Sequence, residues 1–202
     1  MCIRDSLRTE AVRVAHVSGG ASYGRSGDPE GWEPLRVDLS VATGDRVYAA
    51  RGACLDLHTS AFEIHLASGA GLEVISLTEE VKRFYVWGGF SWFLVRDLQP
   101  SESFGVDTPT ASVTFERAGK YQIDVDREGN ARVAADRGSA WVSAAGVAVP
   151  LGTGDAVRIE GIQCPAHDPP LLRSLDIRKS DVETLPCRAR DQVLLFRPRQ
   201  SH

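Results

Sequence analysis

Hydrophobic and polar residues alternate with a period of two in several short segments of the chain. In residues 62–66 every second side chain is apolar, while Glu63 and His65 point to the opposite side. Residues 120–126 repeat the pattern, and shorter examples occur at 55–59, 112–116 and 157–160. Alternation of this kind predicts half-buried β-strands, because successive side chains of a strand point to opposite faces.

Turn-forming residues separate these segments at short intervals. Glycine occurs beside another glycine, Asp or Asn at many of these points, as in Gly19-Gly20, Gly44-Asp45, Gly129-Asn130 and Gly154-Asp155. Many short strands with frequent glycine turns, and no alternation of strands with helices, predict an all-β fold. We expect a solenoid-like or twisted β-sandwich of many short strands, with an irregular C-terminal tail.

One five-residue pattern, Thr-Gly-Asp-x-Val, occurs twice, at residues 43–47 and 153–157. Glycine permits backbone dihedrals that other residues avoid, and the Asp side chain can accept hydrogen bonds from nearby backbone. The pattern therefore predicts one tight turn that is used twice. Its recurrence favours a coiled, rung-like arrangement of strands.

The segment from residue 77 to residue 95 gives mixed indications. Leu77, Val81 and Phe84 have helical spacing, but Gly88-Gly89 interrupts the pattern and the residues after it favour strands. We predict two strands, with at most one helical turn between Leu77 and Lys82. The densest aromatic group of the chain lies here: Phe84, Tyr85, Trp87, Phe90, Trp92 and Phe93. These rings either fill a core or stack against sugars or peptides, and the core interpretation is favoured.

The two ends of the chain differ from its middle. Residues 1–10 are predicted to be an artefact or disordered, because Met1 to Ser6 resemble a translated sequencing adapter of the kind found in metagenomic fragments. Prolines crowd the stretch 162–202, which we expect to be irregular or to hold a short helix with Leu171, Leu172 and Leu175 on one side. This leaves residues 11–161 as the folded domain.

Composition excludes several classes of function. The net charge is −4 and the pI is about 5.7, with no basic stripe for nucleic acid. No apolar run approaches the roughly 18 residues that span a bilayer. The cysteines lack the close pairs of a zinc site. Cys164 and Cys187 are either a disulfide in an oxidising compartment or two free thiols, and Cys54 is expected to be an ordinary, semi-buried strand residue.

A search for catalytic and metal-binding patterns identifies few candidates. Nucleophile-elbow and phosphate-loop motifs are absent from the sequence. His58 and His65 are interpreted as two surface histidines, because their spacing around Glu63 does not fit a metal-binding cupin. Residues 124–130 suggest a calcium loop but lack its closing Glu, so a hairpin turn is favoured. We therefore predict no metal, no cofactor and no assigned catalytic or ligand-binding residue.

Several segments together resemble the FecR-like domain family. They are Trp32 to Leu35, Thr43 to Val47, Ala53 to Leu66, Phe104 to Val113, Gly119 to Asp126 and Gly152 to Val157, in the family's order. The resemblance covers about residues 11–161. The resemblance implies an all-β domain, usually on the periplasmic side of the envelope. Namesake members sit in the inner membrane and control a sigma factor. The family transfers no catalytic residues to this chain.

The sequence thus leads to a non-enzymatic envelope binding or scaffold domain, linked to envelope signal transduction. Its partner is expected to be an unknown protein or a cell-wall polymer, bound through sheet edges or exposed aromatics. The expected location is periplasmic or secreted, with the signal peptide lost together with the true N-terminus. Two alternatives are a sensing fragment of a sigma-factor regulator, and a carbohydrate-active enzyme with Asp124 or Asp126 as acid and base.

Overall fold

The structure, a computed structural model, describes residues 11–28, 30–161 and 175–176. Every regular element in these ranges is a strand, so no membrane-spanning helix is found among them. The strands are β1 (Val12–Ser18), β2 (Ala21–Gly24), β3 (Glu33–Pro34), β4 (Ser40–Val41), β5 (Arg46–Ala49), β6 (Cys54–His58), β7 (Phe62–Leu66), β8 (Gly71–Leu77), β9 (Val81–Val95), β10 (Ser103–Asp107), β11 (Ser112–Phe115), β12 (Gly119–Val125), β13 (Ala131–Arg137), β14 (Ala140–Ala144), β15 (Val147–Leu151), β16 (Ala156–Ile159) and β17 (Leu175–Asp176).

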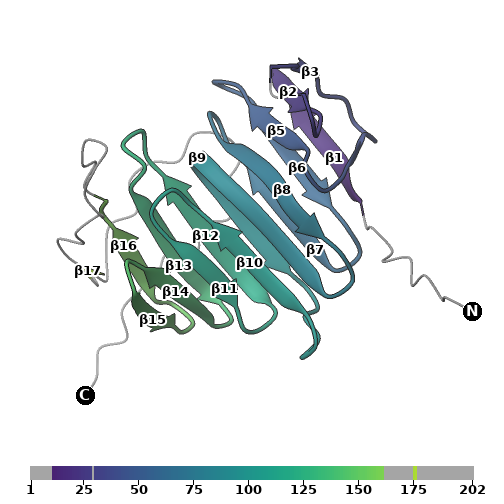
Figure 1. The fold of residues 1–202 in the computed structure, drawn as a ribbon. Helices are drawn as coiled ribbons and strands as arrows, with labels where there is room; N and C mark the ends of the chain where they lie inside the picture. The colour runs from purple at the N-terminus through teal and green to yellow at the C-terminus, as the bar shows by residue number, and fades with distance from the viewer. Residues whose placement is uncertain (1–10, 29, 162–174, 177–202) are drawn as a thin grey trace, which may run out of the picture.

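The strands form two layers that share the long strand β9 (Figure 1). Sheet I has the order β4-β1-β6-β7-β9-β12-β13-β16-β17. Sheet II has the order β3-β2-β5-β8-β9-β10-β11-β14-β15. All pairs are antiparallel except β9 with β10. The predicted all-β fold of many short strands is confirmed.

The core lies between the two sheets and is lined by aromatic rings from both. Phe62 of sheet I lies 5.2 Å from Phe104 and 5.7 Å from Phe84, both of sheet II, in edge-to-face contact. Phe115 of sheet II stacks on Tyr121 of sheet I, with ring centroids 3.9 Å apart. Edge-to-face and offset stacked pairs are the preferred geometries of aromatic rings and add to the burial of their area. The sheets therefore pack face to face as a sandwich.

The alternating segments form the predicted strands, with their apolar sides in this core. The segments 55–59, 62–66, 112–116, 120–126 and 157–160 coincide with β6, β7, β11, β12 and β16 to within one residue at each end. Their apolar residues are at most 3% exposed: Leu55, Leu57, Phe62, Ile64, Leu66, Val113, Phe115, Tyr121, Ile123, Val125, Val157 and Ile159. The period-two pattern thus predicted both the strands and the face that each one buries.

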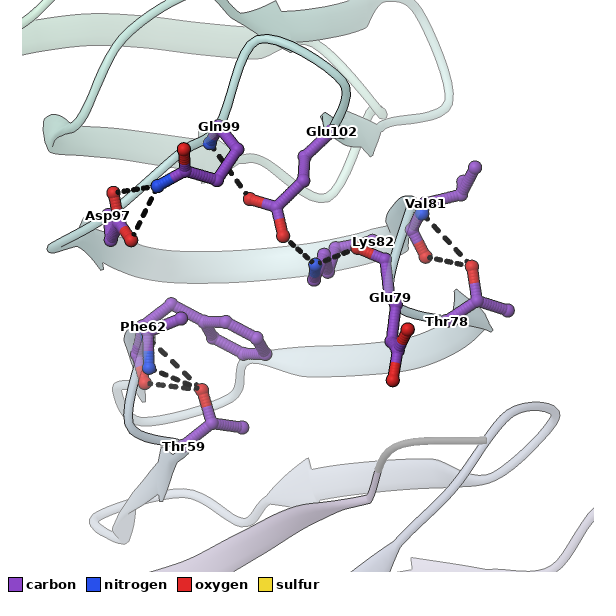
Figure 2. A network of polar contacts seen from close by, with 10 residues as sticks. Thr59, Phe62, Thr78, Glu79, Val81, Lys82, Asp97, Gln99 and Glu102 are labelled. Atoms are coloured by element: carbon purple, nitrogen blue, oxygen red, sulfur yellow. Dashed lines mark hydrogen bonds and ion pairs between the residues drawn. The ribbon is translucent and has the colours of Figure 1, made fainter. Parts of the chain in front are cut away.

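The segment 77–95 contains no helical turn. A tight turn joins β8 to β9, in which the Thr78 hydroxyl accepts a hydrogen bond from the Val81 N–H at 3.0 Å (Figure 2). Gly88 and Gly89, which were expected to interrupt a helix, lie inside a strand, because β9 continues through both of them. Residues before them pair in sheet II, and residues after them pair in sheet I. The glycines let the strand pass from one layer to the other.

The repeated Thr-Gly-Asp-x-Val pattern forms the same turn in both places, as predicted. Gly44 and Gly154 both have a φ of 87°, which favours glycine. Asp45 and Asp155 each accept a hydrogen bond from the backbone N–H three residues earlier, at 2.9 and 3.0 Å. The two sequence copies therefore have the same backbone and the same internal cap.

Both turns also bind the neighbouring strand in the same way. The N–H of Gly44 donates to the Val74 carbonyl of β8 at 2.6 Å, and that of Gly154 donates to the Ala135 carbonyl of β13 at 2.7 Å. The Thr43 hydroxyl accepts a hydrogen bond from the Leu77 N–H at 3.0 Å, and the Thr153 hydroxyl accepts one from the Gly138 N–H at 3.1 Å. Each of these donors lies three residues after the carbonyl that accepts from the glycine. The first turn takes the chain from sheet I to sheet II, and the second takes it back. The repeated pattern is therefore a corner between layers.

Asp45 has two further partners that Asp155 lacks. It accepts hydrogen bonds from the Tyr23 hydroxyl at 2.8 Å and from the Ser26 N–H at 3.0 Å, and it is only 7% exposed. Burial, followed by the hydrogen bond to the Asp45 carboxylate, raises the pKa of Tyr23 to about 12. The first corner therefore contains a buried carboxylate that accepts three hydrogen bonds.

Replacing these two aspartates should have unequal effects on stability. Asp45→Ala leaves three donors without their acceptor and is expected to lower the free energy of unfolding by about 3 kcal/mol or more. Asp155→Ala removes the cap bond from the Gly152 N–H and should cost about 1 kcal/mol. Urea denaturation of both variants measures the difference. Equal losses would show that the extra donors around Asp45 contribute nothing.

The segment between β9 and β10 is held by a buried ion pair (Figure 2). Lys82 is 3% exposed, and its ammonium donates to Glu102 at 2.7 Å and to the Glu79 carbonyl at 2.5 Å. The second carboxylate oxygen of Glu102 accepts from the Gln99 N–H at 3.0 Å, and the Gln99 amide donates to Asp97 at 2.9 Å. These bonds fix the connection that returns the chain to sheet II for the parallel pairing of β10.

This ion pair predicts a loss of stability in acid. The hydrogen bond from Lys82 lowers the pKa of Glu102 below 4.5, against the opposing effect of burial. The unfolded chain therefore takes up the proton first as pH falls, so the contribution of Glu102 is present above its unfolded pKa and is lost through its folded pKa. The difference in urea midpoint between the wild type and Glu102→Gln should shrink between about pH 6 and about pH 3. A difference in urea midpoint that stays constant with pH would contradict the described role of the Glu102 carboxylate.

The C-terminal predictions fall mostly on residues outside the described ranges, including the pair Cys164 and Cys187. Leu175 is described, and it lies in β17, which pairs antiparallel with β16, rather than on a helix. Cys54 is buried in β6, which agrees with its interpretation as an ordinary strand residue.

Candidate functional site

The edges of both sheets offer little backbone for an added strand. The outer strands β3, β4 and β17 are two residues long, and β3 contains Pro34. The remaining edge strand, β15, closes on β14 through a two-residue turn at Ala145 and Gly146, both with positive φ. In an antiparallel hairpin, hydrogen-bonded and non-hydrogen-bonded residue pairs alternate from the turn. Pro150 pairs with Trp141 at a non-hydrogen-bonded position, so its nitrogen faces the open edge, where it has no hydrogen to donate. Short edge strands and edge prolines oppose strand addition. The faces of the sheets are therefore better candidates for a binding surface than their edges.

Five side chains form a row across the outer face of sheet I, which we call the histidine row. Strand register places His16 opposite Asp56, Asp56 opposite His65, His65 opposite Trp92 and Trp92 opposite Gln122. The row crosses β1, β6, β7, β9 and β12. The row brings together residues that are far apart in the sequence. It includes His65 but not His58, the other histidine considered in the sequence analysis.

His65 is the central residue of this row. Its Nδ1 lies 2.5 Å from a carboxylate oxygen of Asp56, and its ring stacks on Trp92 at 5.3 Å with 12° between planes. The Lys120 ammonium lies 5.1 Å from the centre of the same indole. His65 is 8% exposed, so its interpretation as a surface histidine was wrong, whereas His58 is exposed. Stacking under Trp92 is what removes His65 from solvent.

The chemistry open to His65 is limited by this packing. The contact with Asp56 orients the imidazole, as a carboxylate does in catalytic and metal sites. However, Nε2 is buried and has no hydrogen-bond partner. A general base must reach the proton that it abstracts, and an enclosed Nε2 does not. The arrangement therefore serves packing of the outer face in this structure.

Removing Asp56 should reveal how far the histidine depends on it. Asp56→Ala leaves both ring nitrogens of buried His65 without a partner, so we expect a loss of about 1–3 kcal/mol in the free energy of unfolding. His58→Ala, at an exposed position of the same strand, is the control and should change stability by less than about 0.5 kcal/mol. Thermal or urea unfolding compares them. Similar small losses in both would contradict the described role of Asp56.

The two carboxylates proposed as an acid and base pair, Asp124 and Asp126, have different surroundings. Asp126 ends the β12 hairpin and accepts hydrogen bonds from the Glu128 N–H, the Asn130 N–H and the Asn130 amide at 2.8–3.0 Å. Burial alone would raise the pKa of Asp126, but these bonds lower it. The hairpin-turn interpretation of residues 124–130 is confirmed, because this carboxylate is occupied by the turn.

Asp124 faces solvent on the outer side of β12. Desolvation by neighbouring groups raises the pKa of this carboxyl, opposed first by Arg132. The side chain is nevertheless exposed, so water screens the effect. Within the described ranges, no group of three or more His, Cys, Asp or Glu side chains is placed to hold a metal ion.

The aromatic group of residues 84–93 divides between core and surface. Phe84 and Phe93 are fully buried between the sheets, whereas Tyr85, Trp87, Phe90 and Trp92 are half-buried on the outer faces. The core prediction is therefore right for two rings and wrong for four. The most exposed tryptophans are elsewhere, Trp32 at 42% and Trp141 at 40%. Neither ring belongs to the aromatic group of residues 84–93, and no sequence pattern indicates the pairing of Lys82 with Glu102.

Comparison with known proteins identifies relatives by fold. No protein-family model matches the chain, and no curated protein sequence matches it. Two solved structures do, both described as a "putative anti-sigma factor" from Parabacteroides distasonis, at 2.50 and 1.65 Å resolution. Each has a TM-score of 0.51, with 16% and 15% sequence identity respectively, and each match covers 65% of this chain. The match spans 60% of the solved chains. Over that part, the chain has the fold of these Parabacteroides distasonis proteins.

Proposed function

We propose that this chain is the non-enzymatic, envelope-side binding domain of a sigma-factor regulator. The observation that supports the proposal most is the fold shared with two solved proteins described as anti-sigma factors. The motif resemblance to FecR-like domains points the same way and rests on different evidence, namely short segments such as 43–47 and 153–157. Such a domain senses an envelope component and passes the signal to a segment elsewhere in the regulator.

The geometry supports binding through the sheet faces rather than through their edges. Strand addition is the usual way for a sheet to take up an extended peptide, and here the edges are short or carry proline. The faces, by contrast, present half-buried and exposed aromatic rings on rigid strands. A rigid face with aromatic anchors suits recognition, because little side-chain freedom is lost on binding.

Sequencing of the source locus through both ends of this reading frame tests the regulator role. The proposal expects an intact frame that encodes a cytoplasmic segment and a membrane span before residue 11, with this domain on the periplasmic side. A frame that begins with a cleavable signal and holds only this domain would contradict the regulator role. It would support the alternative of a standalone envelope binding protein.

The alternative of a carbohydrate-active enzyme loses its named residues. Paired catalytic carboxylates lie roughly 5–10 Å apart and must both reach the substrate. Asp126 is occupied by three hydrogen bonds of its own turn. No observation on the described residues favours another acid and base pair.

A further inference from the structure

We propose that the outer face of sheet II around Trp141 binds a neutral glycan, with the indole ring as its stacking platform. The proposal rests on the proposed role as an envelope-side binding domain, and it names the class of ligand that the domain recognises. It concerns side chains of β9, β10, β11 and β14, which neighbour one another in that order.

Trp141 differs from the other tryptophans in how its ring is used. Trp32 has the Arg46 guanidinium over its ring at 4.9 Å, and Trp92 has His65 and Lys120 against its own. The ring of Trp87 lies against Gly71, where an added Cβ would be 2.0 Å from it. Among the described residues no ring or cation stacks on Trp141. Its exposed area is therefore available to a ligand.

Trp141 is also fixed in orientation. Its indole N–H donates to a carboxylate oxygen of Glu116 at 2.6 Å. The ring is 40% exposed, so a large part of it faces solvent in this fixed orientation. A fixed ring loses little freedom when a ligand stacks on it, which favours binding.

Hydroxyl side chains lie beside the ring on its β11 side, whereas Pro150 of β15 lies opposite it on the other side. Thr114 lies directly opposite Trp141, and Ser112 lies opposite Ser143 one row away. Thr114 and Ser143 are exposed. An apolar ring edged by hydroxyls matches a pyranose, which has flat C–H faces and a rim of hydroxyl groups. Such side chains donate and accept hydrogen bonds without a net charge.

Beyond Thr114 the face carries the ion pair of Arg83 with Asp107, whose charges cancel. Arg83 makes a two-bond contact with Asp107 and also donates to Ser112 at 2.9 Å. Gly105 lies between Arg83 and Thr114, and a Cβ there would be 3.0 Å from the guanidinium. Three strand spacings separate Trp141 from Arg83, about 14 Å. This length suits two or three sugar units across the strands.

β-1,4-linked glycans with equatorial hydroxyls fit this surface best, because they are extended and have flat apolar faces. The glycan strands of bacterial cell walls are polymers of this kind. Contact with one ring and a few hydroxyls predicts weak binding of a short fragment, with a dissociation constant on the order of 1 mM.

Titration of the ¹⁵N-labelled domain with the β-1,4-linked N-acetylglucosamine tetramer tests the proposal. Changes in amide chemical shift should concentrate on β11 and β14. Trp141→Ala should weaken binding at least tenfold, while its spectrum remains that of a folded protein. Trp32→Ala, which removes an equally exposed but stacked ring, should bind as the wild type does. Glu116→Ala, which frees the indole, should bind more weakly.

Three outcomes would overturn the proposal. They are no shifts at about 10 mM tetramer, ten times the expected dissociation constant, unchanged binding by Trp141→Ala, and a polypeptide partner that uses Trp141 while the tetramer does not bind. None of these bears on the regulator role, which the sequence of the locus decides separately.

Discussion

Replacement of Gly89 by valine is expected to remove a large part of the protein's stability. Gly89 has a φ of 78°, and an added Cβ would lie 2.5 Å from Cα and 2.6 Å from N of Ala70. That backbone is itself held, because Ala70 donates to Ala67 and accepts from Ala49, at 2.9 Å each. A left-handed dihedral for a β-branched residue together with a backbone clash should cost about 4 kcal/mol or more. Most domains are stable by only about 5–15 kcal/mol.

Gly52→Val is the matched control for this substitution. Gly52 has a φ of 80°, but no atom lies within 4 Å of an added Cβ. Only the dihedral cost applies there, about 1–2 kcal/mol. Urea unfolding followed by circular dichroism compares the two variants. Equal losses would mean that the close passage of β9 against Ala70 does not limit the fold.

Replacement of Glu102 by leucine is expected to have the second-largest effect. It leaves the Lys82 ammonium, whose side chain is 4% exposed, with only the Glu79 carbonyl as a partner. Removing one partner of a buried ion pair costs about 3–5 kcal/mol, because the other charge is left uncompensated. The free energy of unfolding from urea titration should fall by about that amount.

The double variant Lys82→Met and Glu102→Leu separates the net contribution of the pair from the cost of breaking it. Exchange of a whole buried pair for apolar side chains of similar size is often neutral or stabilising. The double variant should therefore recover most of the stability lost by Glu102→Leu. A double variant less stable than Glu102→Leu alone would show that the ion pair makes a net contribution that packing does not replace.

Features set by local chemistry could be predicted from the sequence. A half-buried strand must alternate, so the patterns at 62–66 and 120–126 predicted β7 and β12 together with their buried faces. The corner turn depends on a glycine with positive φ and an aspartate that caps its own loop. Both requirements lie within four residues, which is why the short repeat was sufficient to identify it.

Features that depend on strands brought together from distant parts of the chain could not be predicted. His65 has the polar position that alternation assigns, but Trp92, 27 positions later, covers its ring. Lys82 is buried because Glu102 folds over it from the next connection. The passage of β9 between layers depends on Ala70 lying against Gly89. The exposure of Trp141 also depends on register, so the candidate platform required the structure.

The most direct test of the proposed role is sigma-dependent transcription in the source bacterium. An in-frame deletion of residues 11–161 from the intact gene would be compared with the wild type, with the promoters of the sigma factor that the proposed regulator controls as the readout. Loss of the response of those promoters to envelope signals, with the remainder of the protein still produced, is the result that a sensing domain predicts. Promoter activity that responds equally with and without residues 11–161 would contradict the account.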